Sequence, residues 1–497
     1  MAPFTMSQYV RPIHERRAPL AGILAVLSLL LSHAPVAATA GNADRIDALL
    51  ARYRELALFN GSALVADQGQ VVLKKGYGLA NMEWDIPNTP DTKFRLGSLT
   101  KQFTATLIMQ LVERAQIDLA APVTRYLPDY PANPGNRVTI HHLLTHTSGI
   151  VGYTEIPAWS STVRNPYSPT DFLAQFSKLD LLFEPGTRFS YSNSGYFLLG
   201  VVLEKVTGQP YETLLRERIF APAGMNDSGY DATQPLLHKR AAGYDKRFDE
   251  SYVNTAYLDM TQPFSAGSLY STVEDLYRWD QMLLTDKILS AKSRERMFTP
   301  GLSNYGYGWT ITSTNGVRTI SHSGGINGFS TFLTRNPDSK RVIILLNNTG
   351  GAPLEAMADS IRLILDGKDP VMPKRPAAMT LFKTYGASGL AAVLAQAKTM
   401  QAGSEDDAGS SELSRLANQL LATGKHADAL TLARKLADEA PRSAAAAVLV
   451  ARAHRASGHR IEAVQSYARA IELSETPRAF LIYTDAIREI SALEPKP

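Results

Sequence analysis

The sequence predicts an α/β protein of the α+β type: helices flank a five-stranded antiparallel sheet, and a small all-α domain follows. Two strand-like segments lie early in the chain and three lie far downstream. The stretch between them, residues 90–299, has the pattern of helices and loops. From residue 380 onward, Ala and Leu recur at helical spacing, which predicts helices alone.

Length and composition narrow the class of protein. A chain of 497 residues with 44% hydrophobic content can bury a large core and exceeds the usual size of one domain. Its 51 basic and 47 acidic residues nearly balance, so we expect no nucleic-acid partner. The lack of cysteine excludes disulfides, thiolate metal sites, a cysteine nucleophile and a lipid-modified N-terminal cysteine.

Residues 1–40 have the features of a secretory signal. Arg16 and Arg17 precede an apolar stretch over residues 20–31, and Ala38-Thr39-Ala40 offers a small-residue cleavage site. Because the apolar stretch is too short to span a bilayer, we expect no stable membrane span after cleavage. The predicted location is a bacterial periplasm or the exterior, and the alternative is an uncleaved anchor.

Hydrophobic spacing then predicts the main elements in order. The predicted helices cover residues 44–59 and 354–365, and the predicted strands cover residues 62–66, 71–79, 317–322, 328–334 and 341–347. Neither strand group alone would bury an adequate core, so we expect one sheet with the last helix covering a face. The alternative is two small sheets in separate domains.

The chain divides into three parts after the signal. These are a hydrolase-like domain over 41–366, a proline-containing linker over 367–379 and a helical domain over 380–497. In the helical domain, residues 424–430 align with residues 458–464 at a period of 34, which resembles the tetratricopeptide repeat. We expect a polar loop over 403–411 and a capping helix over 477–490. Such repeats would present a surface to a protein partner, and the alternative is a helical bundle without one.

The tetrapeptide Ser98-Leu99-Thr100-Lys101 carries the strongest chemical signal. A serine three residues before a lysine lies one helical turn from it, so the hydroxyl can reach the amine. Apolar residues that follow, such as Phe103 and Leu107, predict a strongly amphipathic helix whose first turn is buried. A buried lysine is costly unless its pKa falls or it bonds to neighbours, which indicates a functional role.

Two backbone N–H groups are candidates for an oxyanion hole. Ser98 at a helix N-terminus presents its own N–H toward an attacked carbonyl. Gly324 and Gly325 follow a predicted strand and let a substrate approach the backbone closely, so the Gly325 N–H is the candidate second donor.

Tyr191 and Asn193 are predicted to lie in a loop before a helix over residues 195–206. A phenol beside a lysine ammonium can have a lowered pKa and act as general base to the serine. The residues alone leave open whether Tyr191, Lys101 or the pair is the base. The alternative is that Tyr191 is a packed aromatic side chain and Asn193 a helix cap.

These motifs resemble the serine hydrolases of the class C β-lactamase and penicillin-binding-protein type. The resemblance covers residues 46–365 and rests on Ser98-Leu99-Thr100-Lys101, Tyr191-Ser192-Asn193 and His322-Ser323-Gly324, in that order. Residues 139–149, 185–193 and 266–269 are similar to the family as well. Related β-lactamases and penicillin-binding proteins pair a Ser-x-x-Lys motif with a downstream Lys-Thr-Gly motif.

The resemblance implies a covalent acyl-serine mechanism on Ser98 without a cofactor, acting on a small-molecule or peptide substrate. Lys101 and Tyr191 would be the activating groups, and Asn193 would orient the substrate amide. The strand that carries His322, Ser323, Gly324 and Gly325 would line the cleft.

The chain departs from the family pattern at His322, where penicillin-recognising members have lysine. A histidine of ordinary pKa is mostly neutral at pH 7, so it is a poor partner for the carboxylate of a β-lactam. Members with histidine here are similar to esterases, D-amino-acid amidases and peptidases, which favours an ester or amide substrate. A β-lactamase or penicillin-binding DD-peptidase is one alternative, and a silent scaffold that tethers cell-wall fragments or proteins is another.

Two further expectations concern histidines. If His322 binds a substrate carboxylate as a cation, affinity for acidic substrates should fall as pH rises through its pKa. His142 and His146, four residues apart next to His141, suggest a zinc site, but no carboxylate follows in a ligand pattern. We therefore expect no metal.

Overall fold

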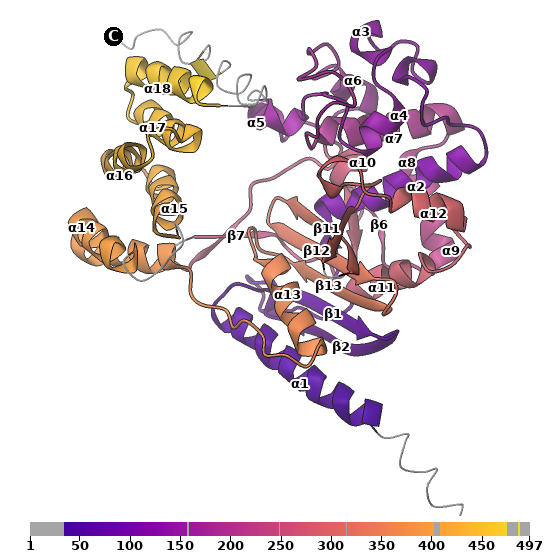
Figure 1. The fold of residues 1–497 in the computed structure, drawn as a ribbon, viewed down its shortest axis with the longest axis horizontal. Helices are drawn as coiled ribbons and strands as arrows, with labels where there is room; N and C mark the ends of the chain where they lie inside the picture. Colours follow the sequence, from indigo (N-terminus) through magenta and orange to yellow (C-terminus); the bar gives the residue numbers. More distant parts are fainter. Residues whose placement is uncertain are drawn as a thin grey trace, which may run out of the picture.

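A central sheet, a helical lobe and a row of C-terminal helices make up the chain (Figure 1). The computed structural model describes residues 34–156, 159–247, 249–314, 316–401, 408–474 and 486–487. Residues 1–33 of the predicted signal lie outside this part, and the remainder belongs to helix α1 (Ala34–Glu55). In the described part, no helix is both long and apolar enough to cross a membrane.

The central sheet has six antiparallel strands rather than the five predicted. In spatial order they are β10 (Thr310–Thr314), β11 (Val317–Ile326), β12 (Phe329–Asn336), β13 (Arg341–Asn347), β1 (Gly61–Asp67) and β2 (Gln70–Tyr77). Gly61 pairs with Asn347 and Ala66 with Val342, so the early and late strands form the single sheet that was predicted. The unpredicted strand is β10, a polar edge strand in which Ile311 is the one buried side chain.

Helices cover both faces of the sheet. On one face, α1 packs against α13 (Leu354–Leu365), and both bury apolar side chains against β1 and β13. The bounds of α13 confirm the predicted helix over residues 354–365. On the other face, α11 (Val273–Met282) contacts β13 and β1. Burial on both faces explains why the interior of β13, residues 342–346, is apolar throughout.

Helix α2 (Thr100–Glu113) runs through the core of the helical lobe. Residues 100–111 are all buried, because α7 (Asn193–Thr207), α8 (Tyr211–Leu215), α10 (Phe264–Gly267) and α12 (Ala291–Met297) pack around it. The expectation of a strongly amphipathic α2 is therefore wrong: its Thr and Gln side chains are buried and hydrogen-bonded instead of facing water. Thr104 Oγ1, for example, lies 2.7 Å from the carbonyl oxygen of Ser265.

Short elements complete this body. The helices are η1 (Gly97–Leu99), η2 (Val123–Arg125), α3 (Ala132–Gly135), α4 (Ile140–Leu144), η3 (Tyr153–Glu155), α5 (Trp159–Thr162), α6 (Pro169–Leu173), η4 (Arg216–Phe220), α9 (Ala221–Ala223) and η5 (Leu302–Asn304). The strands are β3 (Leu79–Asn81), β4 (Ile86–Pro87), β5 (Phe94–Arg95), β6 (Gly229–Tyr230), β7 (Tyr244–Lys246), β8 (Tyr252–Asn254) and β9 (Leu269–Ser271).

The C-terminal helices pack in sequence order beside the sheet body (Figure 1). They are α14 (Ala377–Gln401), α15 (Ala408–Ala422), α16 (His426–Glu439), α17 (Ala444–Ala456) and α18 (Arg460–Glu472). Helices α16 and α18 begin 34 residues apart, at His426 and Arg460, which agrees with the predicted period. Helix α15 begins inside the predicted loop over 403–411. The predicted capping helix over 477–490 lies outside the described residues except for 486–487, which are helical.

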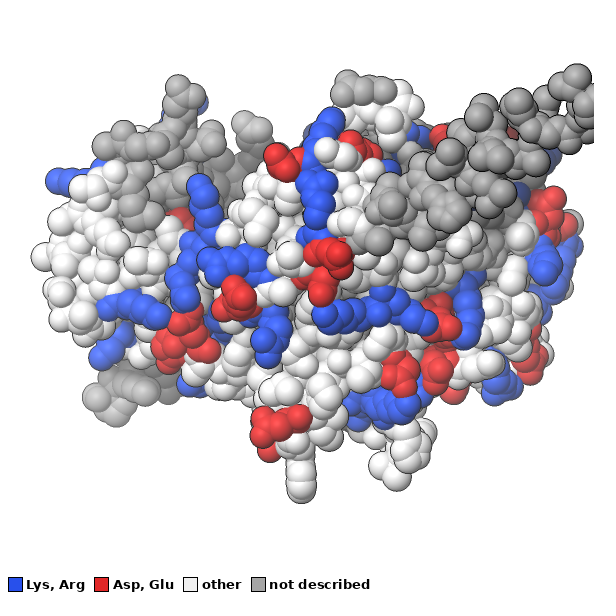
Figure 2. Space-filling model, turned by 90° about the horizontal axis from the view of Figure 1, so that it is seen from below, with Lys and Arg blue, Asp and Glu red and all other residues white. Residues whose placement is uncertain are grey.

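The C-terminal helices are joined to the sheet body by ion pairs. Glu250, in the turn between β7 and β8, pairs with Lys383 of α14 at 2.7 Å and also with Arg375. On the face drawn in Figure 2, basic and acidic side chains are interspersed. This face therefore lacks the single-sign stripe that a nucleic-acid partner would require.

Candidate active site

The Ser98 hydroxyl and the Lys101 amine meet at the junction of η1 and α2. Lys101 Nζ lies 3.0 Å from Ser98 Oγ, as the spacing predicts. Gly97, at φ +55°, packs closely on Gly325. A Cβ added to Gly97 would lie 2.9 Å from the backbone nitrogen of Gly325. This contact brings the end of β11 beside Ser98, which is itself half-buried and reaches solvent.

Lys101 is fully buried, and its amine has three oxygen neighbours. Besides Ser98, Nζ donates to Asn193 Oδ1 and to the carbonyl oxygen of Ala266, each at 2.9 Å. It also lies 4.8 Å and 5.6 Å from the ring centres of Tyr191 and Tyr196. Within the described chain no carboxylate pairs with it, and burial lowers the pKa of Lys101 well below its ordinary value.

Tyr191 lies in the loop before α7, as predicted, but its electrostatics differ from the prediction. Burial raises the pKa of the Tyr191 phenol, and the neighbouring Ser98 hydroxyl offsets only part of that rise. The phenol oxygen is buried and makes no hydrogen bond of ordinary geometry within the described residues. The expected lowering of this pKa by Lys101 is therefore wrong, because the amine faces the ring and desolvation dominates.

Asn193 is the first residue of α7 rather than a loop residue. Its Oδ1 accepts from Lys101, and its Nδ2 donates to Thr154 Oγ1 at 3.2 Å. The helix cap is the preceding Ser192, whose side chain accepts from Gly195 N. Asn193 thus binds the Lys101 amine through Oδ1, while its Nδ2 is held by Thr154.

His146 is a site residue that the sequence analysis considered only as a zinc ligand and not as a neighbour of Tyr191. Its carbonyl oxygen accepts from Ser190 N at 2.9 Å, and its Nδ1 accepts from Ser192 N at 3.0 Å, so one residue holds the backbone on both sides of Tyr191. The His146 and Tyr191 rings pack against each other with centres 4.1 Å apart and an interplanar angle of 35°. Folding brings His146 and the loop of Tyr191 together from separate parts of the chain. The sequence therefore carries no sign of this contact apart from the His-Thr-Ser-Gly stretch that contains His146.

His322 is buried, and both of its ring nitrogens have a hydrogen-bond partner. Its Nε2 lies 2.8 Å from the Tyr305 hydroxyl, and its Nδ1 lies 2.6 Å from the carbonyl oxygen of Ser323. The carbonyl requires a proton on Nδ1, and in the neutral imidazole Nε2 then accepts from the Tyr305 hydroxyl. Burial, with Lys101 as a smaller cause, lowers the pKa of His322 to about 4. A lowered pKa disfavours the hypothesis that His322 binds substrate carboxylates as a cation, which stays a prediction to be tested by pH dependence.

Gly324 and Gly325 lie within β11 rather than after it. A Cβ on Gly324 would lie 2.1 Å from the Leu96 carbonyl oxygen and 3.2 Å from Ser98 N, so the two candidate oxyanion donors lie on touching backbones. Strand β10 pairs with β11 only as far as Ser321. Beyond that point Ser323 and Gly325 are exposed on a strand edge without a partner strand in the described chain.

The three neighbouring histidines point to different places. His141 Nδ1 lies 2.8 Å from the Tyr307 hydroxyl, and His142 Nδ1 accepts from Thr139 N at 3.2 Å. His146 faces Tyr191 instead. Within the described residues no group of three or more His, Asp or Glu side chains is arranged to hold a metal ion.

The fold and the contact between Ser98 and Lys101 are typical of the serine hydrolases. The chain belongs to the beta-lactamase family, because a family model described as Beta-lactamase matches residues 44–366. Penicillin-binding protein 4* of Bacillus subtilis (strain 168) is 34% identical over 346 residues, covering 64% of this chain and 75% of that protein. The matched region of the family model ends before α14.

Solved structures show the same relationship. A penicillin-binding protein from Bacillus halodurans aligns with a TM-score of 0.58 and 30% identity, covering 63% of this chain and 99% of that one. A D-stereospecific amidohydrolase from Streptomyces sp. aligns with a TM-score of 0.54 and 25% identity, covering 65% and 97%. The chain is thus related to penicillin-binding proteins and to an amidohydrolase.

Proposed function

We propose that this protein hydrolyses an ester or amide through an acyl-enzyme on Ser98. The observation that carries the proposal is the 3.0 Å contact between Ser98 Oγ and the buried, lowered-pKa amine of Lys101. An amine whose pKa is lowered by burial loses its proton more readily than an ordinary lysine, and the neutral amine can then accept the proton of the serine hydroxyl.

The proposed reaction has two halves. Ser98 Oγ attacks the substrate carbonyl carbon while its proton moves to Lys101 Nζ, and the N–H groups of Ser98 and Gly325 stabilise the oxyanion. The bond to the leaving alcohol or amine then breaks, and the leaving group takes up the proton. Water hydrolyses the Ser98 ester in the second half and releases the acid. Tyr191 stays a neutral phenol and can donate a hydrogen bond to the leaving group.

Neutral His322 supports an ester or amide substrate without an essential carboxylate. The unpaired edge of β11 at Ser323 and Gly325 supports a backbone-like substrate such as an amino-acid amide or a peptide, since an extended chain can pair with a free strand edge. The relationship to the D-stereospecific amidohydrolase of Streptomyces sp. favours the same substrate class. The names of the penicillin-binding relatives favour the second candidate, a β-lactamase or DD-peptidase.

A substrate panel tests this proposal. Purified protein and its Ser98→Ala variant are assayed with p-nitrophenyl butyrate, D- and L-alanine p-nitroanilide, a D-Ala-D-Ala peptide and a chromogenic cephalosporin. We expect Ser98-dependent turnover of the ester or the anilides that exceeds turnover of the cephalosporin. Turnover that is equal in Ser98→Ala would overturn the proposal, and cephalosporin hydrolysis alone would favour the second candidate.

Three finer features belong to the same proposal. We propose that the chain is exported to the periplasm or secreted, on the features of residues 1–40. We further propose that α15–α18 form tetratricopeptide-like repeats that present a surface to a protein partner, which the 34-residue spacing of α16 and α18 supports. A silent scaffold is the remaining alternative, and labelling of Ser98 by a serine-directed probe would exclude it.

A further inference from the structure

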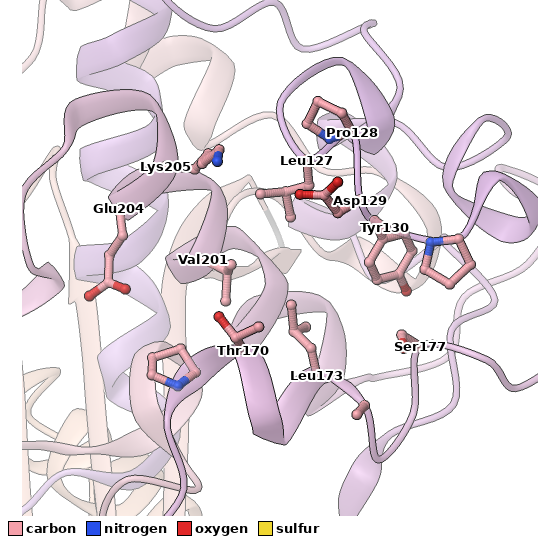
Figure 3. A pocket seen from close by; sticks show the side chains of 13 residues that line it. Leu127, Pro128, Asp129, Tyr130, Thr170, Leu173, Ser177, Val201, Glu204 and Lys205 are labelled. Atoms are coloured by element: carbon pink, nitrogen blue, oxygen red, sulfur yellow. The ribbon is translucent and has the colours of Figure 1, made fainter.

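A cavity of about 450 Å³ lies in the helical lobe, lined by three segments other than the motifs of the active site. Its walls come from the loop after η2, from α6 with the residues that follow it, and from α7 (Figure 3). Leu127, Leu173 and Val201 make the walls apolar. Because a cavity of about 150 Å³ holds benzene, this one can hold a molecule of about 12 to 18 non-hydrogen atoms.

One side of this cavity carries a buried hydroxyl without a partner. Tyr130 is 6% exposed, and its hydroxyl oxygen makes no hydrogen bond within the described chain. Figure 3 shows this hydroxyl directed toward the side of the cavity where Ser177, 7% exposed, also lies. A buried phenol that lacks a partner destabilises the folded chain unless something else bonds to it. The position therefore suits a ligand that brings a polar atom to Tyr130.

The cavity also carries charges. Lys205 and Asp129 line it, are exposed, and form no ion pair within the described chain. Glu204 also lines the cavity, but its carboxylate accepts from Tyr211 N at 2.8 Å and points away from the other side chains in Figure 3. One free cation and one free anion beside an apolar cavity match the carboxylate and the ammonium of a zwitterion.

We propose that this cavity binds a small zwitterion whose apolar body ends in a hydroxyl group, the class to which free tyrosine belongs. Its carboxylate and ammonium would face Lys205 and Asp129, its ring would lie among Leu127, Leu173 and Val201, and its hydroxyl would bond to Tyr130. The proposal is independent of the hydrolytic activity.

The test measures binding of 3-fluorotyrosine and 3-fluorophenylalanine by ¹⁹F NMR, with Ser98 blocked beforehand by a fluorophosphonate so that the active site is excluded. Fluorotyrosine should bind about two- to tenfold more tightly, and Tyr130→Phe should remove that preference. Tyr167→Phe, in the same lobe but not lining the cavity, is the matched control and should keep the preference.

Two further variants locate the probe. Lys205→Gln should weaken both probes by about threefold, whereas Lys178→Gln, an exposed lysine that does not line the cavity, should leave them unchanged. Leu173→Trp should fill the cavity and abolish binding. Absence of binding to the wild type, or binding that is insensitive to Tyr130→Phe and Leu173→Trp, would overturn the proposal.

Discussion

The amine of Lys101 faces the ring of Tyr191, 4.8 Å from its centre, instead of pairing with its hydroxyl. Burial moves the two pKa values in opposite directions, downward for Lys101 and upward for Tyr191. These opposite pKa shifts favour the Lys101 amine, rather than the Tyr191 phenol, as the group that accepts the Ser98 proton.

The pH dependence of kcat/KM follows from this assignment. Activity should fall as pH drops through the lowered pKa of Lys101, because protonation removes the base. Tyr191→Phe should lower the rate about tenfold to a hundredfold through loss of a hydrogen bond to the leaving group, yet keep the acidic limb of the profile. Loss of that limb in Tyr191→Phe would instead identify Tyr191 as the base. Lys101→Gln should lose nearly all activity.

Acidic pH should destabilise the protein through His322. An unfolded histidine takes up a proton near pH 6.5, whereas the folded one does so at about 4, so the unfolded state binds more protons between these values. Stability is therefore lost as pH falls from 6.5 toward 4, by about 2 kcal/mol at pH 5 from this residue. Urea unfolding of the wild type and His322→Asn at pH 7 and pH 5 measures the difference. An equal loss in both proteins would contradict the neutral, buried His322.

A neutral His322 also predicts how KM for acidic substrates depends on pH. Between pH 5 and pH 8, KM for a carboxylate-bearing ester should show no step that depends on His322, because the imidazole stays uncharged over this range. Paired assays of an ester and its carboxylate analogue in the wild type and His322→Asn measure this. A step near pH 6.5 that disappears in His322→Asn would show that His322 is charged in the free enzyme.

His146 should act as a positioning residue for Tyr191. His146→Asn keeps an acceptor near the place of Nδ1 and suits the backbone at φ +57°, whereas His146→Leu keeps bulk but removes the acceptor. We expect kcat to fall about tenfold or more in His146→Leu, with KM little changed, and to be largely rescued in His146→Asn. The pair His142→Asn and His142→Leu is the control. A larger loss in His146→Asn than in His146→Leu would reduce its role to filling space.

Two adjacent glycines offer a matched test of the contact between β11 and η1. A Cβ on Gly324 would lie 2.1 Å from the Leu96 carbonyl oxygen and 2.2 Å from Thr331 Oγ1, whereas a Cβ on Gly325 meets nothing within 4 Å. Gly324→Ala should therefore lower stability by about 1–3 kcal/mol and reduce activity, because the strand must move away from Ser98. Gly325→Ala keeps its backbone N–H and should stay as stable as the wild type. Thermal unfolding and ester turnover of both variants decide this.

The sequence predicted the parts of the fold that depend on local pattern. Strand β13 and helix α13 have their predicted bounds, since each combines a clear apolar pattern with turn residues at its ends. Strand β10 was missed because an exposed edge strand needs little apolar alternation. The burial of α2 on all sides depends on distant helices that pack around it, which local spacing cannot reveal.

In the candidate site, too, the sequence predicted what depends on local geometry and missed what depends on the folded chain. The 3.0 Å contact between Ser98 and Lys101 follows from helical geometry, so the motif predicts it. The contact by which His146 holds the loop of Tyr191 joins residues 46 positions apart in the chain, and the burial that lowers the pKa of His322 comes from the packed fold. Desolvation, which sets the pKa of Lys101 and of Tyr191, also depends on the complete packing and not on the residues next to them.

Intact mass spectrometry after incubation with a fluorophosphonate tests the central claim most directly. The account predicts one phosphonyl group on the wild type, located on Ser98 by peptide mapping, none on Ser98→Ala, and much slower labelling of Lys101→Gln. A wild type that gains no adduct and hydrolyses no ester, or an adduct that persists in Ser98→Ala, would contradict an activated Ser98.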